Sequence, residues 1–544
     1  MIDLSNNPHG SAWVADARVR RKAGLYKKTG FYIGTDEAGR PCHSDQQAAV
    51  MICGGARSLK GSLIIPGLVD GCLNGDFGPV NIVSMDWKRQ NGEIAALQVR
   101  QGRHIISIAP REAVSSNIDV LSYIDPKSPE LIPLAKLFAS NWIPFSGSPQ
   151  AQYFEGTAQR ITEAVLVTLA RLKGSVSLPE LADVMSGLGD ATDEWLSFEY
   201  HLSVAPEAQY RKVAQELSRL REQGSDSGGY NGIKNEIAKA FAVMSDPQWR
   251  KVLSPPYDFC PSQLTKDGAP PYLVNIAENI DYAKTSGGVL RAIYTSFLIY
   301  KRRAPISTTR EQVWLLDEIG NIGGAWPMAV ELATFGPGYR IRPIYVVQST
   351  AQFDNLAPKA STIVPNSCGT QIFTGIRSVE QASIVSRQLG KTTLEYKDPA
   401  QTQREEAAQQ KAMMAMVLGK TDPVSAMMAS SHHERMAQQP KRMPRDIRTL
   451  DELLREPNGR AFVFMPGVLE KPFYAHIPKY WQRRDLAGKY LADPFHAKPG
   501  TVEVKTWLGQ RHRQVVTEPV PSKYADWPQY RDTGLWSYVK GFRP

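Results

Sequence analysis

Cysteine is scarce in this sequence of 544 residues, and its placement excludes several classes of protein. The five cysteines, Cys42, Cys53, Cys72, Cys260 and Cys368, are odd in number, scattered and without a Cys-x-x-Cys pair. This pattern argues against a disulfide scaffold and against a zinc site, and it favours a reducing compartment. The nine histidines form no cluster of the kind that binds a metal.

Long apolar runs are also missing. No run approaches the roughly 20 residues that a membrane span requires. The polar start of the chain, MIDLSNNPHGS, does not resemble a signal peptide. We therefore expect no direct membrane span and a cytoplasmic protein.

Charge and length give two broader expectations. Lysine and arginine number 64 against 54 acids, so the net charge is +10. This excess favours a polyanionic partner, nucleic acid first, although a generally basic cytosolic protein is the alternative. The length exceeds that of one ordinary core, which predicts two or more domains.

Residues 313–318 (VWLLDE) are the most informative stretch. Four apolar residues lead directly into Asp317 and Glu318, as in a strand buried on both faces of a parallel sheet. Ligands of such sheets bind at the carboxyl ends of the strands. In a nucleoside-triphosphate motor the first acid holds Mg²⁺ through water and the second polarises the attacking water. Two solvated acids at a strand end are the alternative.

A second apolar run, residues 48–53, leads into a glycine-bearing loop and then a probable helix. The loop residues are Gly54, Gly55, Ala56, Arg57, Ser58, Leu59, Lys60, Gly61 and Ser62. Strand, loop, lysine and helix are the layout of a phosphate-binding loop, whose usual pattern is G-x-x-x-x-G-K-[ST]. Gly54 and Lys60 have the right spacing, but Leu59 replaces a glycine and Gly61 replaces the hydroxyl residue. The loop alone is therefore not a specific signal.

Further strands are predicted at 80–88, 104–110, 271–276, 343–347, 370–375 and 461–467. Because helical stretches alternate with them, we predict an α/β fold with a mostly parallel central sheet. Gln348 follows one of these strands, where a side chain suits sensing of a γ-phosphate. A capping amide is the alternative for Gln348.

The remaining segments predict the domain division. It comprises a basic arm (1–30), a nucleotide-binding domain in two parts (31–127 and 256–482), an inserted all-helical domain (128–255) and a basic, aromatic tail (483–544). Within the second part, residues 396–442 form a mobile or partly helical insert. Its methionines predict a helix with a core face, with a partner groove as the alternative. The aromatic residues of the tail suit either single-stranded nucleic acid or packing on the body.

At this point the chain resembles the TraG-like coupling proteins of type IV secretion and conjugation. The resemblance covers roughly residues 45–485. It is carried by the loop at 54–61 with the apolar helix behind it, and by the segments 86–88 (DWK), 153–158 (YFEGTA), 315–323 (LLDEIGNIG), 348–353 (QSTAQF), 366–371 (NSCGTQ) and 445–454. These segments occur in the order of the family, and the acidic segment at 315–323 is the closest match.

The resemblance implies a RecA-like P-loop ATPase with an all-helical domain, expected to form a homo-hexamer around a channel. It implies ATP and Mg²⁺ as cofactors. Lys60 would bind the β- and γ-phosphates, Asp317 the hydration shell of Mg²⁺, Glu318 the attacking water and Gln348 the γ-phosphate. The implied partners are DNA, a relaxase or effector protein, and the secretion channel with its ATPases. The implied location is the inner membrane, held peripherally through secretion partners.

Departures from the family in the loop, at Pro337 and at the N-terminus weaken that assignment. Arg57 and Leu59 stand where the family has glycines, and we expect Leu59 to lose access to positive φ. Pro337 stands where many relatives carry an arginine that reaches the γ-phosphate of a neighbour; Arg340 or Arg342 would replace it only if the loop were rebuilt. Because no hydroxyl directly follows Lys60, Mg²⁺ would rely on water or on Ser62. The N-terminal membrane helices of the family have no counterpart here.

Three hypotheses follow from the sequence. The first is an ATP-hydrolysing coupling protein, and the second is a relative that has lost fast hydrolysis and recruits substrate. The third, another RecA-like DNA pump for packaging or segregation, fits the order of the segments poorly.

Overall fold

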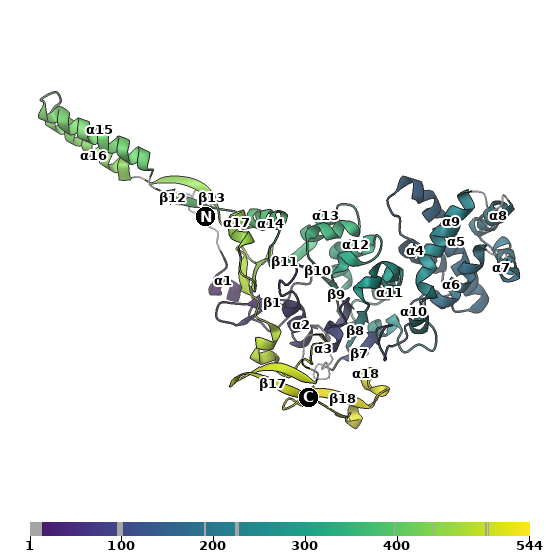
Figure 1. The fold of residues 1–544 in the computed structure, drawn as a ribbon. Coiled ribbons are helices and arrows are strands. Elements are labelled where there is room, and N and C mark those ends of the chain that lie inside the picture. Colours follow the sequence, from purple (N-terminus) through teal and green to yellow (C-terminus); the bar gives the residue numbers. More distant parts are fainter. Residues whose placement is uncertain are drawn as a thin grey trace.

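The computed structural model describes residues 14–94, 102–189, 192–222, 228–396, 398–438, 440–495, 498 and 500–544. Its centre is one eleven-stranded sheet with the order β2-β1-β15-β14-β11-β3-β10-β9-β6-β8-β7 (Figure 1). The strands of this sheet are β1 (Phe31–Thr35), β2 (Pro41–Ser44), β3 (Ala49–Gly54), β6 (Asn81–Asp86), β7 (His104–Ile108), β8 (Tyr272–Ala277), β9 (Gln312–Asp317), β10 (Ile341–Val347), β11 (Cys368–Thr374), β14 (Arg460–Phe464) and β15 (Phe473–His476).

Seven of these strands, from β11 to β7 in the sheet order, run parallel to one another. The four strands at the other edge, β14, β15, β1 and β2, pair antiparallel. The predicted mostly parallel sheet is confirmed. The antiparallel edge joins strands from near both ends of the chain, which no local sequence pattern indicates.

The parallel strands are buried on both faces, as their unbroken apolar runs predict. In β9, Trp314 and Leu316 join one core, whereas Val313 and Leu315 join a second core on the other face. Helix α2 (Gly61–Val69) packs into the second core, and most helices of the chain pack into the first. The sheet is thus the middle layer of three.

Most of the remaining helices follow in two groups. Between the sheet strands β7 and β8 the described chain is helical: α4 (Leu131–Trp142), α5 (Pro149–Lys173), α6 (Leu178–Ser186), α7 (Asp193–Ser203), α8 (Ala208–Glu222), α9 (Gly228–Phe241) and α10 (Pro247–Val252). Around the later strands lie α3 (Asn91–Ile94), α11 (Ala283–Arg303), α12 (Pro327–Phe335), α13 (Ala360–Ser367), α14 (Val379–Leu389) and α17 (Leu450–Leu454). The exact domain boundaries stay predictions.

Three segments lie outside this scheme. The first part of the predicted arm, residues 1–13, lies outside the described residues; the rest contains α1 (Ala17–Lys22), whose Arg20 is buried. A helical hairpin, α15 (Pro399–Val417) and α16 (Pro423–Gln438), projects from the two-stranded β12 (Lys391–Tyr396) and β13 (Lys441–Asp446) (Figure 1). The pair β4 (Asn74–Gly75) and β5 (Gly78–Pro79) forms a small ribbon.

The C-terminal tail forms a three-stranded sheet of β16 (Thr501–Thr506), β17 (Gly509–Pro519) and β18 (Leu535–Val539), with the short helix α18 (Pro528–Arg531). Tyr530, Trp536 and Tyr538 are buried together within the tail, and Trp527 contacts His104 of β7, so the aromatic residues of the tail pack on one another and on the body. Trp507 is different, because it remains 85% exposed. Across the described ranges, no helix combines the length and the apolarity that crossing a bilayer requires.

Candidate nucleotide site

The predicted site residues come from strands that end at one edge of the sheet. β3 pairs in parallel with β10, Cys53 opposite Val347, and β10 pairs in parallel with β9, Val346 opposite Asp317. The carboxyl ends of all three strands therefore meet, and the loop after β3, the acids after β9 and Gln348 after β10 lie together. This is the edge at which α/β sheets bind ligands.

The loop at residues 54–62 is fastened to β11. The backbone N–H of Gly55 donates to the Gly375 carbonyl at 3.3 Å, and the Thr374 hydroxyl donates to the Ser58 carbonyl at 3.1 Å. A Cβ added at Gly54 would lie 2.5 Å from the Thr374 carbonyl oxygen, so only glycine fits there. The neighbouring strand thus fixes the course of the loop.

The same loop offers a row of backbone donors. Throughout the described chain, no group accepts a hydrogen bond from the backbone N–H of any residue from 56 to 61. These donors stand just before and at the first residue of α2, where the helix dipole also favours an anion. Because a Cβ at Gly61 would meet nothing within 4 Å, the space beside this helix start is open. The loop fits a phosphate group.

The backbone at Arg57 and Leu59 corrects one expectation from the sequence. Both residues adopt left-handed conformations, with φ of 58° and 64°. Leu59 therefore does not lose access to positive φ; it keeps the conformation that glycine would take, at a cost of about 1–2 kcal/mol for a residue with a Cβ. Its side chain packs against the second core. The fastening of the loop to β11 overrides the local preference of leucine.

Replacing Arg57 by glycine is expected to raise the free energy of unfolding by about 0.5–1 kcal/mol, because glycine relieves the left-handed strain at some entropic cost. The Arg57 side chain is exposed, so little packing is lost. Urea unfolding of the purified protein measures the change. Arg57→Ala is the matched control, because it keeps the Cβ and should give no gain. An equal gain in both variants would contradict left-handed strain at this position.

Lys60 folds back onto its own loop. Its Nζ donates to the carbonyls of Gly54 at 2.6 Å and Gly55 at 3.4 Å. Burial lowers the pKa of Lys60, and the charges of Glu318 and Asp317 oppose that shift. The ammonium group therefore lies between the loop and the two acids, where a phosphate bound by the loop would meet it.

The Glu318 carboxylate is held by three donors. Oε1 lies 3.4 Å from Lys88 Nζ and 3.5 Å from Gln348 Nε2, while Oε2 accepts from Asn321 Nδ2 at 3.2 Å. Glu318 is only 9% exposed and has a φ of 45°, a strained value of the kind that clusters at functional sites. Its carboxylate is thus held in place by these contacts, which suits a group that polarises water.

Asp317 differs from its neighbour, because none of the described residues donates a hydrogen bond to its carboxyl group. Burial raises the pKa of Asp317 to about 7, the charges of Glu318 and Asp86 add to the shift, and Lys88 and Lys60 oppose it. A carboxylate that is short of compensating partners favours a cation. The position therefore fits the hydration shell of Mg²⁺.

Asp317 also predicts how the stability of the protein without nucleotide or Mg²⁺ depends on pH. Its folded pKa of about 7 exceeds the ordinary 3.8, so the folded state holds a proton that the unfolded chain releases. Its contribution to stability is therefore present at low pH and is lost as the pH rises toward and through 7. Asp317→Asn should be more stable than the wild type at pH 8 by roughly 1–3 kcal/mol, with a smaller difference at pH 5.

Urea unfolding at several pH values measures this difference. Asp267→Asn, at an exposed turn position, is the control and should leave the pH profile unchanged. Parallel profiles for the wild type and Asp317→Asn would contradict the raised pKa.

Reasoning from the sequence missed three residues of this site. Lys88 and Asn321 contact Glu318, and Gln381 Nε2 donates to the Gln348 carbonyl at 2.6 Å. Lys88 follows the strand-ending Asp86, whose carboxylate accepts from two backbone N–H groups of the next turn. The acid at the end of that strand could have indicated Lys88 as a site residue, whereas no sequence pattern indicated Gln381.

Arg340 and Arg342 were the candidates to replace the arginine that many relatives carry at the position of Pro337. Both are held away from the site. Pro337 lies in a short 3₁₀ turn, and β10 begins at Ile341 after it. Arg340 forms an ion pair with Asp76, and Arg342 lies 3.9 Å from Glu311. Both arginines are at the amino end of β10, opposite the edge that carries the site. In this arrangement neither is a free cation.

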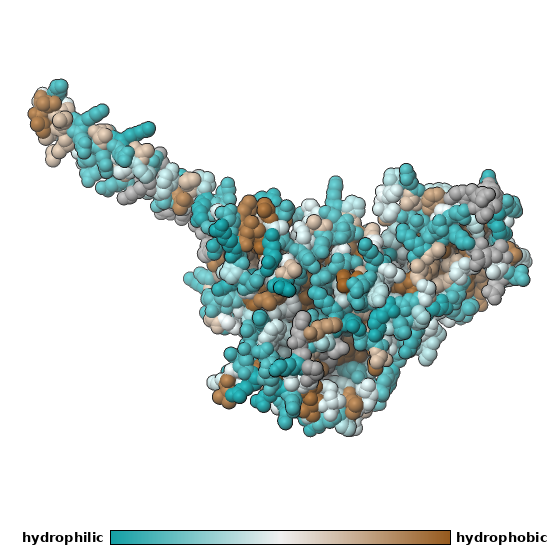
Figure 2. All heavy atoms as spheres, in the orientation of Figure 1, coloured by the Kyte–Doolittle hydropathy of each residue, from teal (hydrophilic) through white to brown (hydrophobic). Residues whose placement is uncertain are grey.

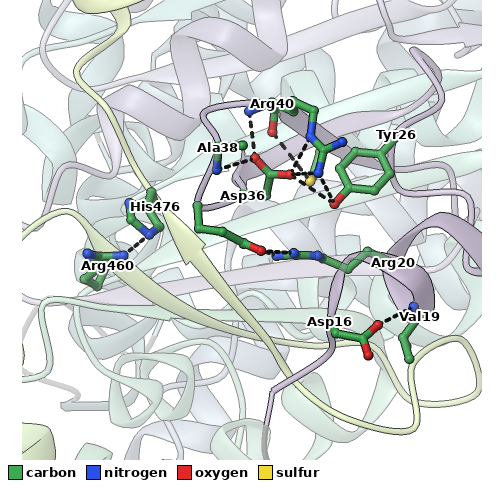
Figure 3. A network of polar contacts seen from close by, with 11 residues as sticks. Asp16, Val19, Arg20, Tyr26, Asp36, Ala38, Arg40, Arg460 and His476 are labelled. Carbon is green, nitrogen blue, oxygen red and sulfur yellow. Dashed lines mark hydrogen bonds and ion pairs between the residues drawn. The ribbon is translucent and has the colours of Figure 1, made fainter.

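A cavity of about 900 Å³ adjoins the loop at Leu59. One wall is the β1–β2 turn, in which Asp36 accepts from the Ala38 N–H at 2.9 Å and from Arg40 Nε at 2.7 Å (Figure 3). The lining also includes Arg460 and His476, which contact each other on the neighbouring strands β14 and β15 (Figure 3). Its cationic lining residues are Lys28, Arg40, Arg460, Lys479, Arg483 and Arg484. Asp36, Glu37 and Asp485 line it as well, so its walls carry both charges, and the cavity has room for a polar heterocyclic group next to the loop.

One trio of metal-binding residue types lies away from this site. His43, Asp70 and Cys72 place their ligand atoms within 4.8 Å of one another. Asp70 accepts from the Cys72 N–H at 2.9 Å and lies 3.1 Å from His43 Nε2, so the trio is hydrogen-bonded within itself. It supplies three ligands where structural zinc sites use four. We assign no metal to it.

The family model described as Type IV secretory system Conjugative DNA transfer matches residues 12–417, about three quarters of the chain. Among curated proteins, none matches the sequence significantly.

Three solved structures share the fold. The unbound monoclinic form of the bacterial conjugative coupling protein TrwBΔN70 is similar with a TM-score of 0.60 at 13% identity, covering 89% of this chain and 97% of that chain. The plasmid coupling protein TrwB in complex with ADP and Mg²⁺ gives 0.57 at 13% identity, with 87% and 96% covered. TrwB in complex with the GTP analogue GDPNP gives 0.58 at 14% identity, with 89% and 96% covered. At these identities the likeness establishes the fold.

Proposed function

The chain belongs to the type IV secretory system conjugative DNA transfer family, and from this we propose that it is an ATP-driven coupling protein. It would receive relaxase-bound DNA or an effector protein and pass it to the secretion channel. The observation that carries the proposal is the meeting of Lys60, Asp317, Glu318 and Gln348 beside the free N–H groups of the loop. A phosphate-binding loop beside an oriented carboxylate is the arrangement that hydrolysis of a bound nucleotide uses, and this supports the motor.

Nucleotide binding would use the loop and the cavity beside it. The N–H groups of residues 56–61 and Lys60 would hold the β- and γ-phosphates, and the cavity next to Leu59 would hold the base and ribose. Asp317 would bind the hydration shell of Mg²⁺, which neutralises phosphate charge when bound. A coupling protein of the same fold has been crystallised with ADP and Mg²⁺, which supports this choice of ligands.

Hydrolysis would depend on Glu318. Lys88 and Asn321 hold its carboxylate in place, so that it can orient and polarise a water for attack on the γ-phosphate. Gln348 lies beside Glu318 at the end of the adjacent strand, where it would contact the γ-phosphate. In this scheme residues 337–342 supply no arginine finger to the γ-phosphate of a neighbouring subunit.

We also propose the setting in which the protein acts. A homo-hexamer around a channel would place DNA against the basic chain, whose net charge is +10. Secretion-channel subunits and their ATPases would be its partners, at the cytoplasmic face of the inner membrane.

A second function, a recruitment platform without fast hydrolysis, is favoured by two observations. Arg57 and Leu59 keep a strained loop where glycine would be relaxed, and Pro337 stands where an arginine finger is expected. Such a finger is worth roughly 10³ or more in rate. In this alternative the fold and the acids persist while substrate binding is the retained activity.

ATP turnover by the purified protein separates the two functions. We expect hydrolysis that is stimulated by single- or double-stranded DNA. Calorimetry with ATP and Mg²⁺ provides the binding measurement. Absence of both turnover and nucleotide binding would reject the motor for this chain, and nucleotide binding without turnover would favour the platform.

A further inference from the structure

The β-hairpin of β16 and β17 carries cations that the rest of the tail does not neutralise. Elsewhere in the tail, Arg483, Arg531 and Arg543 each form an ion pair with a carboxylate. Arg511 and Arg513 of β17 are exposed, and neither forms an ion pair with any acid of the described chain. The two arginines are therefore free to bind an anion from outside the chain.

Arg511 and Arg513 lie on one face of the β-hairpin. In the register of the two strands Arg511 stands opposite Val504 and Arg513 opposite Val502, and opposite residues of an antiparallel pair share a face. Both valines are buried in the second core, so this face turns toward the body. The arginines are roughly 7 Å apart along the strand. Glu503, the acid of β16, lies on the other face and does not offset their charge.

An open aromatic ring stands at the tip of the same β-hairpin. Trp507 lies in the turn that joins the two strands and is 85% exposed. The Arg484 guanidinium, which also lines the cavity beside the loop, lies 4.5 Å from the centroid of the ring. This contact covers one face of the indole and leaves the other face open. We call Arg484, Trp507, Arg511 and Arg513 the Trp507 surface.

The chemistry of the Trp507 surface fits a single strand of nucleic acid. Proteins bind such strands by stacking bases on exposed aromatic rings and by placing cations along the phosphates. In a duplex the bases cover one another, and unstacking them costs a few kcal/mol. An indole at the tip of a hairpin therefore finds a free ring face mainly on an unpaired base. The arginines supply the charge that a strand of phosphates requires.

A bilayer fits the Trp507 surface less well. An interfacial segment buries a broad apolar face. Here the turn contributes Trp507 and Leu508, and the Arg484 guanidinium on the ring would have to enter the hydrocarbon with it. The tail sheet forms the lobe at the bottom of Figure 1, and in Figure 2 the visible face of this lobe is teal and white with separate brown spots.

We propose that the Trp507 surface binds single-stranded nucleic acid, with the indole stacked on a base and with Arg511 and Arg513 on the phosphates. This inference rests on the proposed function, because it locates a contact of the DNA that the coupling protein would move. The contact itself requires neither ATP nor the acids of the nucleotide site. Binding can therefore be measured separately from hydrolysis.

Fluorescence anisotropy tests the proposal, with the purified full-length protein titrated into a dye-labelled oligothymidine of about 20 nucleotides and no ATP. Trp507→Ala should weaken binding at least about tenfold, whereas Trp507→Phe keeps a ring and should stay within about threefold of the wild type. Arg511→Gln with Arg513→Gln should lower the slope of log affinity against log salt by about 1.4, which is about 0.7 for each phosphate contact.

Two controls match these changes. Phe335→Ala removes another exposed aromatic ring, and Lys127→Gln with Lys266→Gln removes the same charge at exposed positions. Both should leave the affinity and the salt slope unchanged. Wild-type protein that does not bind the oligothymidine would overturn the proposal, and so would losses in the controls as large as those in the variants of the Trp507 surface.

Other ligands give different results. If Trp507→Ala weakens binding to a duplex of the same length as much as to the single strand, the surface binds duplex DNA and the single-strand assignment is wrong. If Trp507→Ala loses phosphatidylglycerol vesicles and keeps the oligothymidine, the surface belongs to a bilayer. A loss confined to ATP in calorimetry would place the ring at the cavity that Arg484 lines.

ATP turnover of the wild type separates failure of this surface from failure of the proposed function. DNA-stimulated turnover, together with unchanged oligothymidine binding in Trp507→Ala, would reject the surface and keep the motor. Oligothymidine binding that depends on Trp507, without any turnover, would keep the surface and reject the motor.

Discussion

Replacing Glu318 by glutamine is expected to lower ATP turnover by about a hundredfold or more, while nucleotide affinity stays within about threefold of the wild type. Glutamine keeps the size of the side chain and one oxygen for Lys88 or Asn321, but it cannot take a proton from water. The change therefore removes a transition-state interaction and leaves the phosphate contacts of the loop in place.

Steady-state turnover and calorimetric titration with ATP measure the two quantities separately. Glu331→Gln is the control, because Glu331 is exposed on α12 and lies outside the site. If turnover survives in Glu318→Gln, the water is activated by another group. A parallel loss of affinity would instead mean that Glu318 supports the loop through Lys60, whose pKa responds to its charge.

Lys88 gives a graded version of the same experiment. Its Nζ lies 3.4 Å from Glu318, and its side chain is 61% exposed, so it orients the carboxylate without being enclosed. A variant without Lys88 should keep part of its turnover, because Asn321 and Gln348 still contact the same carboxylate. A total loss of turnover would indicate that Lys88 contacts the nucleotide directly and does not only position Glu318.

The centre of this fold is predictable because its strands are buried on both faces. An apolar run such as 313–316 has one stable place, inside a parallel sheet, and the polar residues that follow must then lie at its edge. The local sequence therefore predicts, before the fold is known, that Asp317, Glu318, Gln348 and the loop lie together. Parallel pairing with β10 supplies the rest of that arrangement.

The parts that could not be predicted depend on contacts between distant segments. Leu59 adopts positive φ because Thr374, more than 300 positions away, fastens the loop, and no local propensity reports such a contact. The cavity beside Leu59 combines the β1–β2 turn with residues 458–485 for the same reason. The prediction for the hairpin of α15 and α16 was wrong for a different reason. Apolar residues at helical spacing usually indicate a core, and here they are exposed near the far end of the hairpin.

Replacing Lys60 by alanine is expected to give the largest change, with turnover reduced about a thousandfold or more and nucleotide affinity weakened by at least about tenfold. The ammonium group lies on the loop itself, and its present partners are two loop carbonyls. Lys88 does not replace it, since Lys88 contacts Glu318. Lys266→Ala, at an exposed position, is the control.

The same variant separates the motor from the platform when transfer of DNA or effector protein is measured in cells. A motor requires the nucleotide cycle, so Lys60→Ala and Glu318→Gln should both abolish transfer while the protein still folds and binds DNA. A platform uses the fold alone, and both variants should then support transfer at the wild-type level. Transfer lost in Lys60→Ala and kept in Glu318→Gln would describe a third case, in which bound nucleotide orders the protein and its hydrolysis is dispensable. Because Glu318 is proposed to polarise water and Lys60 to bind phosphate, these outcomes show whether transfer depends on nucleotide binding or on its hydrolysis.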